Sequence, residues 1–175
     1  QSPTLLHIDG YGCSLGLSLF YRKRFYRYAG IDLMIDICSN LPSNNNKVFL
    51  LGATSQVVQK TSVVLRRINP NLTIQVNDGY FGLSDPELSR IREKIDRFRP
   101  NIIFIGISSP KKEIVATYLL DSLETNSTLL GVGGSFDVIS GLIPRAPLFI
   151  QSIGLEWCWR AVQEPRRLLI RYLTS

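Results

Sequence analysis

Segments rich in glycine, small and polar residues recur along this 175-residue chain, each directly after a short apolar run. Small residues let backbone N–H groups approach a phosphate closely, and the start of a following helix adds a favourable dipole. In an open α/β sheet such segments meet beyond the carboxyl ends of the strands. We therefore expect a pocket for a nucleotide or sugar nucleotide there. The segments are residues 9–12, 52–54, 78–81, 108–113 and 131–137.

Asp9 is the candidate for acid–base chemistry, because it directly follows the first strand-like run. A carboxylate at a strand tip can accept a proton from an attacking hydroxyl. The alternative is a structural Asp-Gly turn with Gly10, which composition alone favours.

Three cations are candidates for binding a diphosphate. Arg27 and Arg145 can clamp phosphate oxygens in a bidentate fashion, whereas Lys112 would act as a point charge. The alternative for each is a solvated surface cation.

The other candidate residues in these segments also have two interpretations each, one functional and one structural. Tyr80 and Phe81 can stack on a base or fill the core, and Asp137 can bind a ligand hydroxyl or cap the helix that follows. The sequence has no Walker A or Gly-x-Gly-x-x-Gly motif and no Asp-x-Asp pair, so we expect a metal-independent reaction without a cofactor.

The elements that must position these residues alternate. Strand-like runs separated by helix-like stretches of 10–15 residues predict βαβ units and a parallel sheet. The fold class is therefore α/β, a three-layer Rossmann-like and mostly parallel sheet with helices on both faces. Strands are expected at Leu5–Ile8, Lys47–Leu51, Thr73–Val76, Ile102–Ile107 and Thr128–Val132. Helices are expected at Ser14–Tyr26, Gly30–Leu41, Ser55–Ile68, Pro86–Phe98, Lys111–Glu124 and Phe136–Ser140.

The chain is basic, with 20 Lys and Arg against 14 Asp and Glu, a net charge of +6. This balance points to an anionic partner: nucleic acid, an acidic membrane face or a phosphorylated ligand. A nucleic-acid-binding module rests on the charge alone, because no nucleic-acid-binding motif accompanies it. The three cysteines have neither a disulfide nor a zinc spacing.

The segment 147–175 is expected to be a helical part of the same domain, broken near Gly154 and at Pro165. It mixes apolar and aromatic residues with Arg166, Arg167 and Arg171. That composition suits a helix lying on an anionic membrane face, and equally an ordinary docking helix with a solvated basic side.

The motifs taken together resemble the WecG/TagA/CpsF glycosyltransferase family of bacteria (glycosyltransferase family 26). The resemblance is strongest in the run 131–137, which reads Gly-Val-Gly-Gly-Ser-Phe-Asp, and continues through Arg-Ala-Pro at 145–147, Gly-Leu-Glu-Trp at 154–157 and Gln-Glu-Pro-Arg-Arg-Leu at 163–168. Upstream, Asp9-Gly10-x-Gly12, Arg27-x-x-Gly30, Gly79-Tyr80-Phe81 and Pro110-Lys111-x-Glu113 fit the same family.

The resemblance implies inverting, metal-independent transfer of an N-acetylmannosamine-type sugar, or its uronic acid, from a UDP-sugar to an undecaprenyl-diphosphate-linked acceptor. It implies a role in cell-surface polysaccharide or teichoic-acid synthesis, on the inner face of the cell membrane, by a chain that tends to self-associate. Asp9 would be the general base and Arg27 a ligand of the phosphates. The predicted substrate contacts are Gly10, Gly52, Tyr80, Phe81, Pro110, Lys112, Glu113, Gly133, Gly134, Phe136, Asp137 and Arg145.

Two departures from the family qualify this expectation. Lys112 stands where the family usually has a glutamine, and a lysine cannot accept a hydrogen bond as an amide can. Family members also begin about fifty residues earlier, so we expect residues 1–175 to be one domain that lacks its N-terminal part. The alternative function is a catalytically impaired, UDP-sugar-binding remnant of the family.

Overall fold

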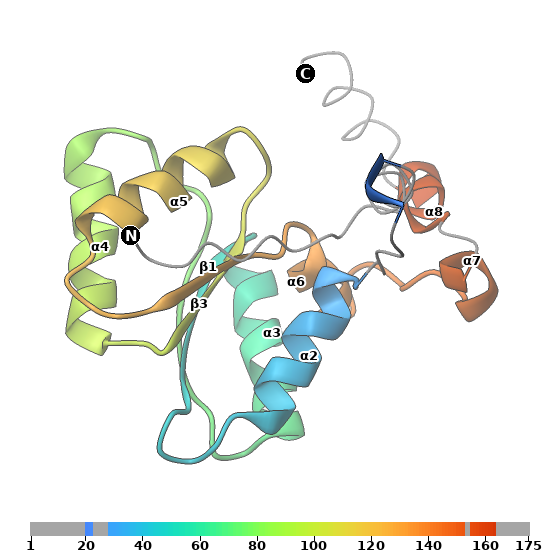
Figure 1. Ribbon diagram of the computed structural model, residues 1–175, viewed down its shortest axis with the longest axis horizontal. Helices are drawn as coiled ribbons and strands as arrows, with labels where there is room; N and C mark the ends of the chain where they lie inside the picture. Colours follow the sequence, from blue (N-terminus) through green and yellow to red (C-terminus); the bar gives the residue numbers. More distant parts are fainter. Residues whose placement is uncertain (1–19, 23–27, 153–154, 164–175) are drawn as a thin grey trace. The chain divides into compact units, whose positions relative to one another are not determined.

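Four parallel strands organise the first of the two units, residues 1–142 and 143–175, into which the chain divides. The computed structural model describes residues 20–22, 28–152 and 155–163 (Figure 1). The strands are β1 (Lys47–Gly52), β2 (Thr73–Asn77), β3 (Ile102–Gly106) and β4 (Thr128–Gly131), in the order β2-β1-β3-β4. The described part of the chain thus confirms the predicted α/β fold with a parallel sheet.

Both faces of the sheet are buried, as the continuous apolar strands predict. Side chains alternate along β1, so that Val48 and Leu50 enter one core while Phe49 and Leu51 enter the other. All four are 0% exposed. The register sets Leu50 opposite Val76 of β2 and Phe104 of β3, which aligns the carboxyl ends of the central strands.

Helices cover the two faces separately (Figure 1). The first core lies under α2 (Gly30–Asn40), α3 (Ser55–Ile68) and α6 (Ser135–Ile139). The second lies under α4 (Asp85–Phe98) and α5 (Lys111–Ser122), which contribute residues such as Ile95 and Leu119. These are the three layers expected from the sequence.

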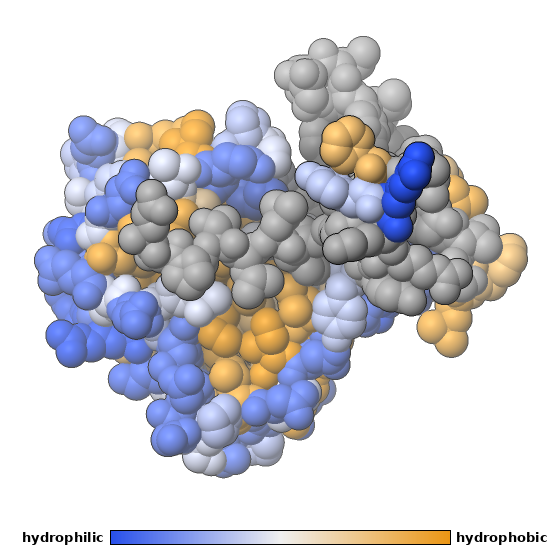
Figure 2. Space-filling model, viewed as in Figure 1, coloured by the Kyte–Doolittle hydropathy of each residue, from blue (hydrophilic) through white to orange (hydrophobic). Residues whose placement is uncertain are grey.

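The helix α4 shows why its sequence forms a helix on this face. Leu88, Ile91 and Ile95 recur at helical spacing and are buried, while charged residues occupy the outer side, and Figure 2 shows hydrophilic residues gathered over this helix. The N-cap Ser84 precedes it, with a proline in its first turn, as predicted. Arg99 ends it in a left-handed conformation (φ 53°) and donates its N–H to the Ile95 carbonyl.

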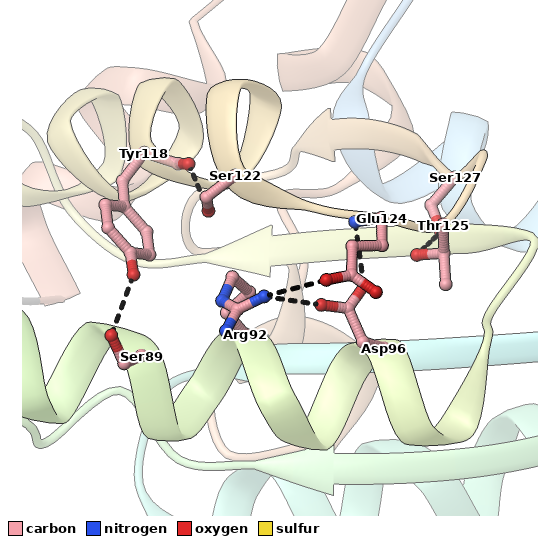
Figure 3. A network of polar contacts seen from close by, with 8 residues as sticks. All are labelled: Ser89, Arg92, Asp96, Tyr118, Ser122, Glu124, Thr125 and Ser127. Carbon is pink, nitrogen blue, oxygen red and sulfur yellow. Dashed lines mark hydrogen bonds and ion pairs between the residues drawn. The ribbon is translucent and has the colours of Figure 1, made fainter.

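Polar contacts join α4 to α5 and to the loop before β4 (Figure 3). Arg92 lies 3.3 Å from Asp96 and 3.7 Å from Glu124, and the Glu124 N–H donates to Asp96 Oδ1. The Ser89 and Tyr118 hydroxyls are 3.2 Å apart. Since the ion pairs are partly exposed, each adds less than about 1 kcal/mol. Arg92 and Asp96 hold the loop after α5 against α4, and the Ser89–Tyr118 contact joins α5 itself to α4.

The observed bounds differ from the expected ones by one or two residues. The helix expected to reach Glu124 ends at Ser122, because the Glu124 N–H is taken by Asp96 instead. The strand expected to reach Val132 ends at Gly131, although the Val132 N–H still donates to the Ile105 carbonyl. The expected strand Leu5–Ile8 and most of the expected helix Ser14–Tyr26 lie outside the described residues.

The second unit contains α7 (Leu148–Ser152) and α8 (Glu156–Gln163). Its described side chains are tied together by Gln151 Nε2, which donates to the Ala146 carbonyl, and by Trp159 Nε1, which donates to the Pro144 carbonyl. The predicted segment 147–175 is thus helical where it is described, and the expected breaks at Gly154 and Pro165 lie outside the described residues. Among the residues described, no helix combines the length and the apolar character needed to cross a bilayer.

We expect Gly52→Ala to lower the free energy of unfolding by more than about 3 kcal/mol. Gly52 has φ +142°, a conformation that L side chains rarely adopt, and a Cβ there would lie 2.4 Å from the carbonyl of Gly106. The matched control is Gly141→Ala, where φ is +76° but no atom lies within 4 Å, with an expected cost of about 1–2 kcal/mol. Urea unfolding measures both, and equal losses would show that the Gly52–Gly106 contact does not constrain the sheet.

Candidate functional site

Four of the five loops predicted to form the site, those after β1, β2, β3 and β4, meet at the carboxyl edge of the sheet, and the fifth, residues 9–12, lies outside the described residues. The order β2-β1-β3-β4 places the reversal of strand order between β1 and β3, the position where open α/β sheets bind ligands. Backbone hydrogen bonds join the loops directly: Ala53 N–H to the Gly106 carbonyl (3.1 Å) and Gly79 N–H to the Ala53 carbonyl (2.9 Å). The loops after β1, β2 and β3 therefore form one continuous rim.

Gly52 and Gly106 allow this rim to close. A Cβ on Gly52 would overlap Gly106, and a Cβ on Gly106 would lie 2.6 Å from the Phe136 ring. Phe136 is 0% exposed, and its carbonyl accepts a hydrogen bond from the Thr61 hydroxyl (3.1 Å). Phe136, predicted to contact substrate, is thus placed in the core directly beneath the rim, where it positions the loop that it belongs to.

The loop after β2 distinguishes Tyr80 from Phe81, two residues that the sequence predicts either to stack on a base or to fill the core. Tyr80 is 79% exposed, whereas Phe81 packs against the core under α4 and α5. The Tyr80 N–H donates to Asp78 Oδ1 (3.0 Å), and Asp78 Oδ2 accepts a hydrogen bond from the Ser55 hydroxyl at the start of α3 (2.7 Å). Tyr80 is therefore exposed to a ligand, whereas Phe81 is partly buried against this core.

Lys111, the first residue of α5, holds the same loop from the other side. Its ammonium donates to the Gly79 carbonyl (2.9 Å) and to the Phe81 carbonyl, and lies 3.9 Å from the centre of the Phe81 ring. Lys111 was not among the predicted site residues, although it is adjacent to Lys112 and of the same type. Only the three-dimensional structure distinguishes the two lysines.

Glu87 is a third anchor of the loop and was also missed. Its carboxylate accepts a hydrogen bond from the Gly82 N–H (2.8 Å) and another from the Ser84 hydroxyl (2.7 Å). These two bonds, with a smaller contribution from the charge of Lys111, hold the pKa of Glu87 below its ordinary value. The Ser84-x-x-Glu87 spacing, characteristic of a capping box, was the signal that could have identified it.

Unlike Lys111, Lys112 has a side chain that makes no contact with a backbone carbonyl among the described residues. Its side chain is 30% exposed, and its ammonium lies 3.2 Å from Glu113 Oε1. The stem runs beside Gly131, where a Cβ would lie 3.2 Å from the lysine Cδ, so the glycine makes room for it. Lys112 can thus contribute positive charge between the ends of β3 and β4.

Pro110 is the N-cap of α5 and Glu113 lies in its first turn, where the Glu113 carboxylate accepts a hydrogen bond from the Ser109 hydroxyl (2.7 Å). Partial burial raises the pKa of Glu113, but hydrogen bonds from Ser109, its own N–H and Lys112 outweigh that effect and leave the pKa below its ordinary value. Glu113 is therefore ionised near neutral pH and orients the Lys112 ammonium.

The glycine-rich loop after β4 has an open backbone at Gly133. This residue has φ +51°, and a Cβ there would meet no atom within 4 Å. Gly134 precedes the short helix α6, and Asp137 in the first turn of that helix is 8% exposed. An open glycine at the sheet edge is where the backbone can approach a ligand closely.

The remaining predicted residues lie either in the second unit or outside the described residues. Arg145 belongs to the second unit, where its Nε lies 3.7 Å from Glu156 Oε1. Within the described ranges, no group of three or more His, Cys, Asp and Glu side chains is arranged to hold a metal ion. The predicted residues that lie outside the described ranges are Asp9, Gly10, Arg27, Arg166, Arg167 and Arg171.

Comparison with known proteins gives consistent results over the whole chain. The family model described as "Glycosyl transferase WecG/TagA/CpsF family" matches residues 1–175. The chain is 34% identical over 160 residues to a protein of Staphylococcus aureus strain MW2 named N-acetylglucosaminyldiphosphoundecaprenol N-acetyl-beta-D-mannosaminyltransferase. Proteins of the same name from strains NCTC 8325 / PS 47 and MRSA252 are 34% and 33% identical. Each alignment covers 91% of this chain and 61% of the relative, so the chain spans less than two thirds of their length.

We expect the Glu87 carboxyl to titrate below 4.5 and Ser84→Ala to raise its pKa, because the variant removes one of the two hydrogen bonds. A depressed folded pKa contributes stability that is complete above the unfolded pKa and is lost as pH falls through the folded pKa. The loop should therefore loosen only in acid, and the Gly82 amide signal should shift with the same midpoint. Carbon-detected NMR titration measures both, and a Glu87 pKa at or above 4.5 would contradict the anchoring.

Proposed function

Because this chain belongs to the WecG/TagA/CpsF glycosyl transferase family, we propose that it transfers an N-acetylmannosamine-type sugar, or its uronic acid, from a UDP-sugar to an undecaprenyl-diphosphate-linked sugar. The observation that carries the proposal is the 34% identity over 91% of the chain to relatives whose name states both the transferred sugar and the lipid-linked acceptor. The product would enter cell-wall polysaccharide or teichoic-acid synthesis.

The rim geometry supports a nucleotide-sugar donor. Loops after four parallel strands meet where α/β folds bind nucleotides. Gly133 leaves an open approach to the backbone, Lys112 supplies positive charge, and Tyr80 offers an exposed ring. These are the groups that a diphosphate and a planar base require.

The reaction we propose is a single inverting displacement without a metal ion. Asp9 accepts the proton of the acceptor hydroxyl, whose oxygen forms a bond to the anomeric carbon as the bond from that carbon to the UDP oxygen breaks. The negative charge then develops on the departing UDP. Arg27, Lys112 and backbone N–H groups of the glycine-rich loops offset this charge.

Lys112 also affects which donor sugars we propose. A lysine cannot accept a hydrogen bond from a sugar hydroxyl, but it pairs well with a carboxylate. We therefore include the uronic acid among the proposed donors. Arg145 is proposed as an additional phosphate ligand, with its guanidinium oriented by Glu156.

An acceptor anchored in a bilayer requires the enzyme to work at the membrane surface. We propose that the chain binds the inner membrane face peripherally, through the basic C-terminal segment, and that it self-associates. Clustered arginines are attracted to anionic lipids by about 1 kcal/mol each near the surface.

For the general base, Asp9→Asn is expected to lower kcat by about 10²–10⁴-fold while leaving UDP binding intact, because the amide cannot take the proton. The measurement is UDP release with a lipid-diphosphate acceptor. Asp121→Asn, on the exposed side of α5, is the matched control and should keep full activity.

Full activity in Asp9→Asn would remove Asp9 from the mechanism. Calorimetric UDP binding without turnover in the wild-type chain would favour the second candidate, a binding-only remnant.

For the membrane, changing Arg166, Arg167 and Arg171 to Glu is expected to abolish flotation with vesicles containing anionic lipid. Wild-type binding should weaken as salt rises, because the attraction is screened within about 10 Å at 0.1 M salt. The control reverses three exposed cations of the first unit, Lys60, Arg67 and Arg90, and should bind nearly as the wild type does. Salt-independent binding would rule out the electrostatic part of the proposal.

A further inference from the structure

Tyr80 combines a large exposed side chain with a tightly held backbone. Its ring is 79% exposed, yet its N–H donates to Asp78 Oδ1 and the carbonyls on either side of it, those of Gly79 and Phe81, both accept hydrogen bonds from Lys111. Exposed loop residues usually keep conformational freedom, because little holds their peptide groups. Here the peptide before the exposed ring is held at both its carbonyl and its N–H, and the Phe81 carbonyl is held one residue further along.

Lys111 is placed to act on this loop and not on a ligand. Two of its N–H groups are directed to carbonyls, and its ammonium lies 3.9 Å from the centre of the Phe81 ring, which itself packs on the core. A lysine committed in this way has little capacity left for a phosphate. The neighbouring Lys112, paired with Glu113, is the cation that remains for that purpose.

We propose that Lys111 is a positioning residue for donor binding: it holds the carbonyls of Gly79 and Phe81, the two neighbours of Tyr80 in the chain, and so presents the Tyr80 ring as a stacking surface for the planar base of the nucleotide. The inference rests on the proposed function, since it takes the ligand to be a nucleotide. It assigns base contact to Tyr80, loop geometry to Lys111 and phosphate charge to Lys112.

The energetic reason is preorganisation. A stacked base contributes about 1–3 kcal/mol, but part of this is lost when the aromatic side chain must first be ordered. Because Lys111 and Asp78 hold the backbone before the ligand arrives, the binding event orders only the side-chain torsions of Tyr80. Removing the Lys111 contacts should therefore weaken base binding without touching phosphate binding.

The test measures calorimetric dissociation constants for UDP and for inorganic pyrophosphate, which has no base, together with amide hydrogen exchange of residues 79–82. Lys111→Met keeps the aliphatic stem and removes the donors. It should weaken UDP binding about tenfold, leave pyrophosphate binding unchanged and speed exchange in the loop. Tyr80→Ala should weaken UDP binding similarly without speeding exchange, and Tyr80→Phe should bind as the wild type does.

Two further variants separate positioning from general stability. Lys111→Arg retains two donors and a planar group that can stack on Phe81, so it should restore most of the UDP affinity. Lys60→Met makes the same substitution at an exposed position of α3 and should change neither affinity nor loop exchange.

Each contrary result has a distinct meaning. If Lys111→Met binds UDP as tightly as the wild type, or weakens pyrophosphate as much as UDP, the positioning role is wrong, and in the second case Lys111 contacts the phosphates itself. If the wild-type chain does not bind UDP, the proposed function and this inference fail together. If it binds UDP but transfers no sugar, only the transfer reaction fails, and the variants still decide the role of Lys111.

Discussion

The close approach of β1 and β3 at Gly52 and Gly106 is the constraint on which the rest of the site depends. Any side chain at Gly52 would occupy the space of the Gly106 backbone, and any at Gly106 would meet the Phe136 ring. Because both positions lack side chains, the Ala53 N–H reaches the Gly106 carbonyl and the loops after the two strands join. The loop after β2 then attaches to Ala53 through the Gly79 N–H, so three loops share one rim.

The charged side chains at this rim have two functions: some hold the backbone of the loop, and Lys112 is proposed to bind a ligand. Lys111 and Glu87 are committed to carbonyl, N–H and hydroxyl groups of the loop after β2. Lys112 instead lies beside Gly131, with Glu113 as its ionic partner. The Ser89–Tyr118 contact joins α4 to α5 (Figure 3), and α5 carries both lysines at its first turn. A site of this kind keeps its geometry before a ligand binds, which lowers the entropic cost of binding.

Much of the fold could be predicted from the sequence, because apolar periodicity and helix caps are local signals. The helix Ser55–Ile68 was predicted at both ends, and the structure shows Thr54 capping it through the Val57 N–H. The end of α5 could not be predicted, because the Glu124 N–H bonds to Asp96, 28 positions away in the chain. The sequence could not separate Tyr80 from Phe81, or Lys111 from Lys112, because each pair consists of adjacent residues of similar type. Their different roles depend on which side chain is directed towards the rest of the fold, and this is visible only in three dimensions. The predicted base and the terminal arginines lie outside the described residues, so they remain predictions.

The proposed function requires the carboxyl edge of the sheet to bind the nucleotide of the donor. The most direct measurement is a map of backbone amide shifts on titration with UDP in the assigned chain. We expect the largest changes on residues 52–54, 79–82, 108–113 and 131–135, with the outer faces of α3 and α4 unchanged. Changes centred on those outer helix faces, or no saturable change at all, would contradict it.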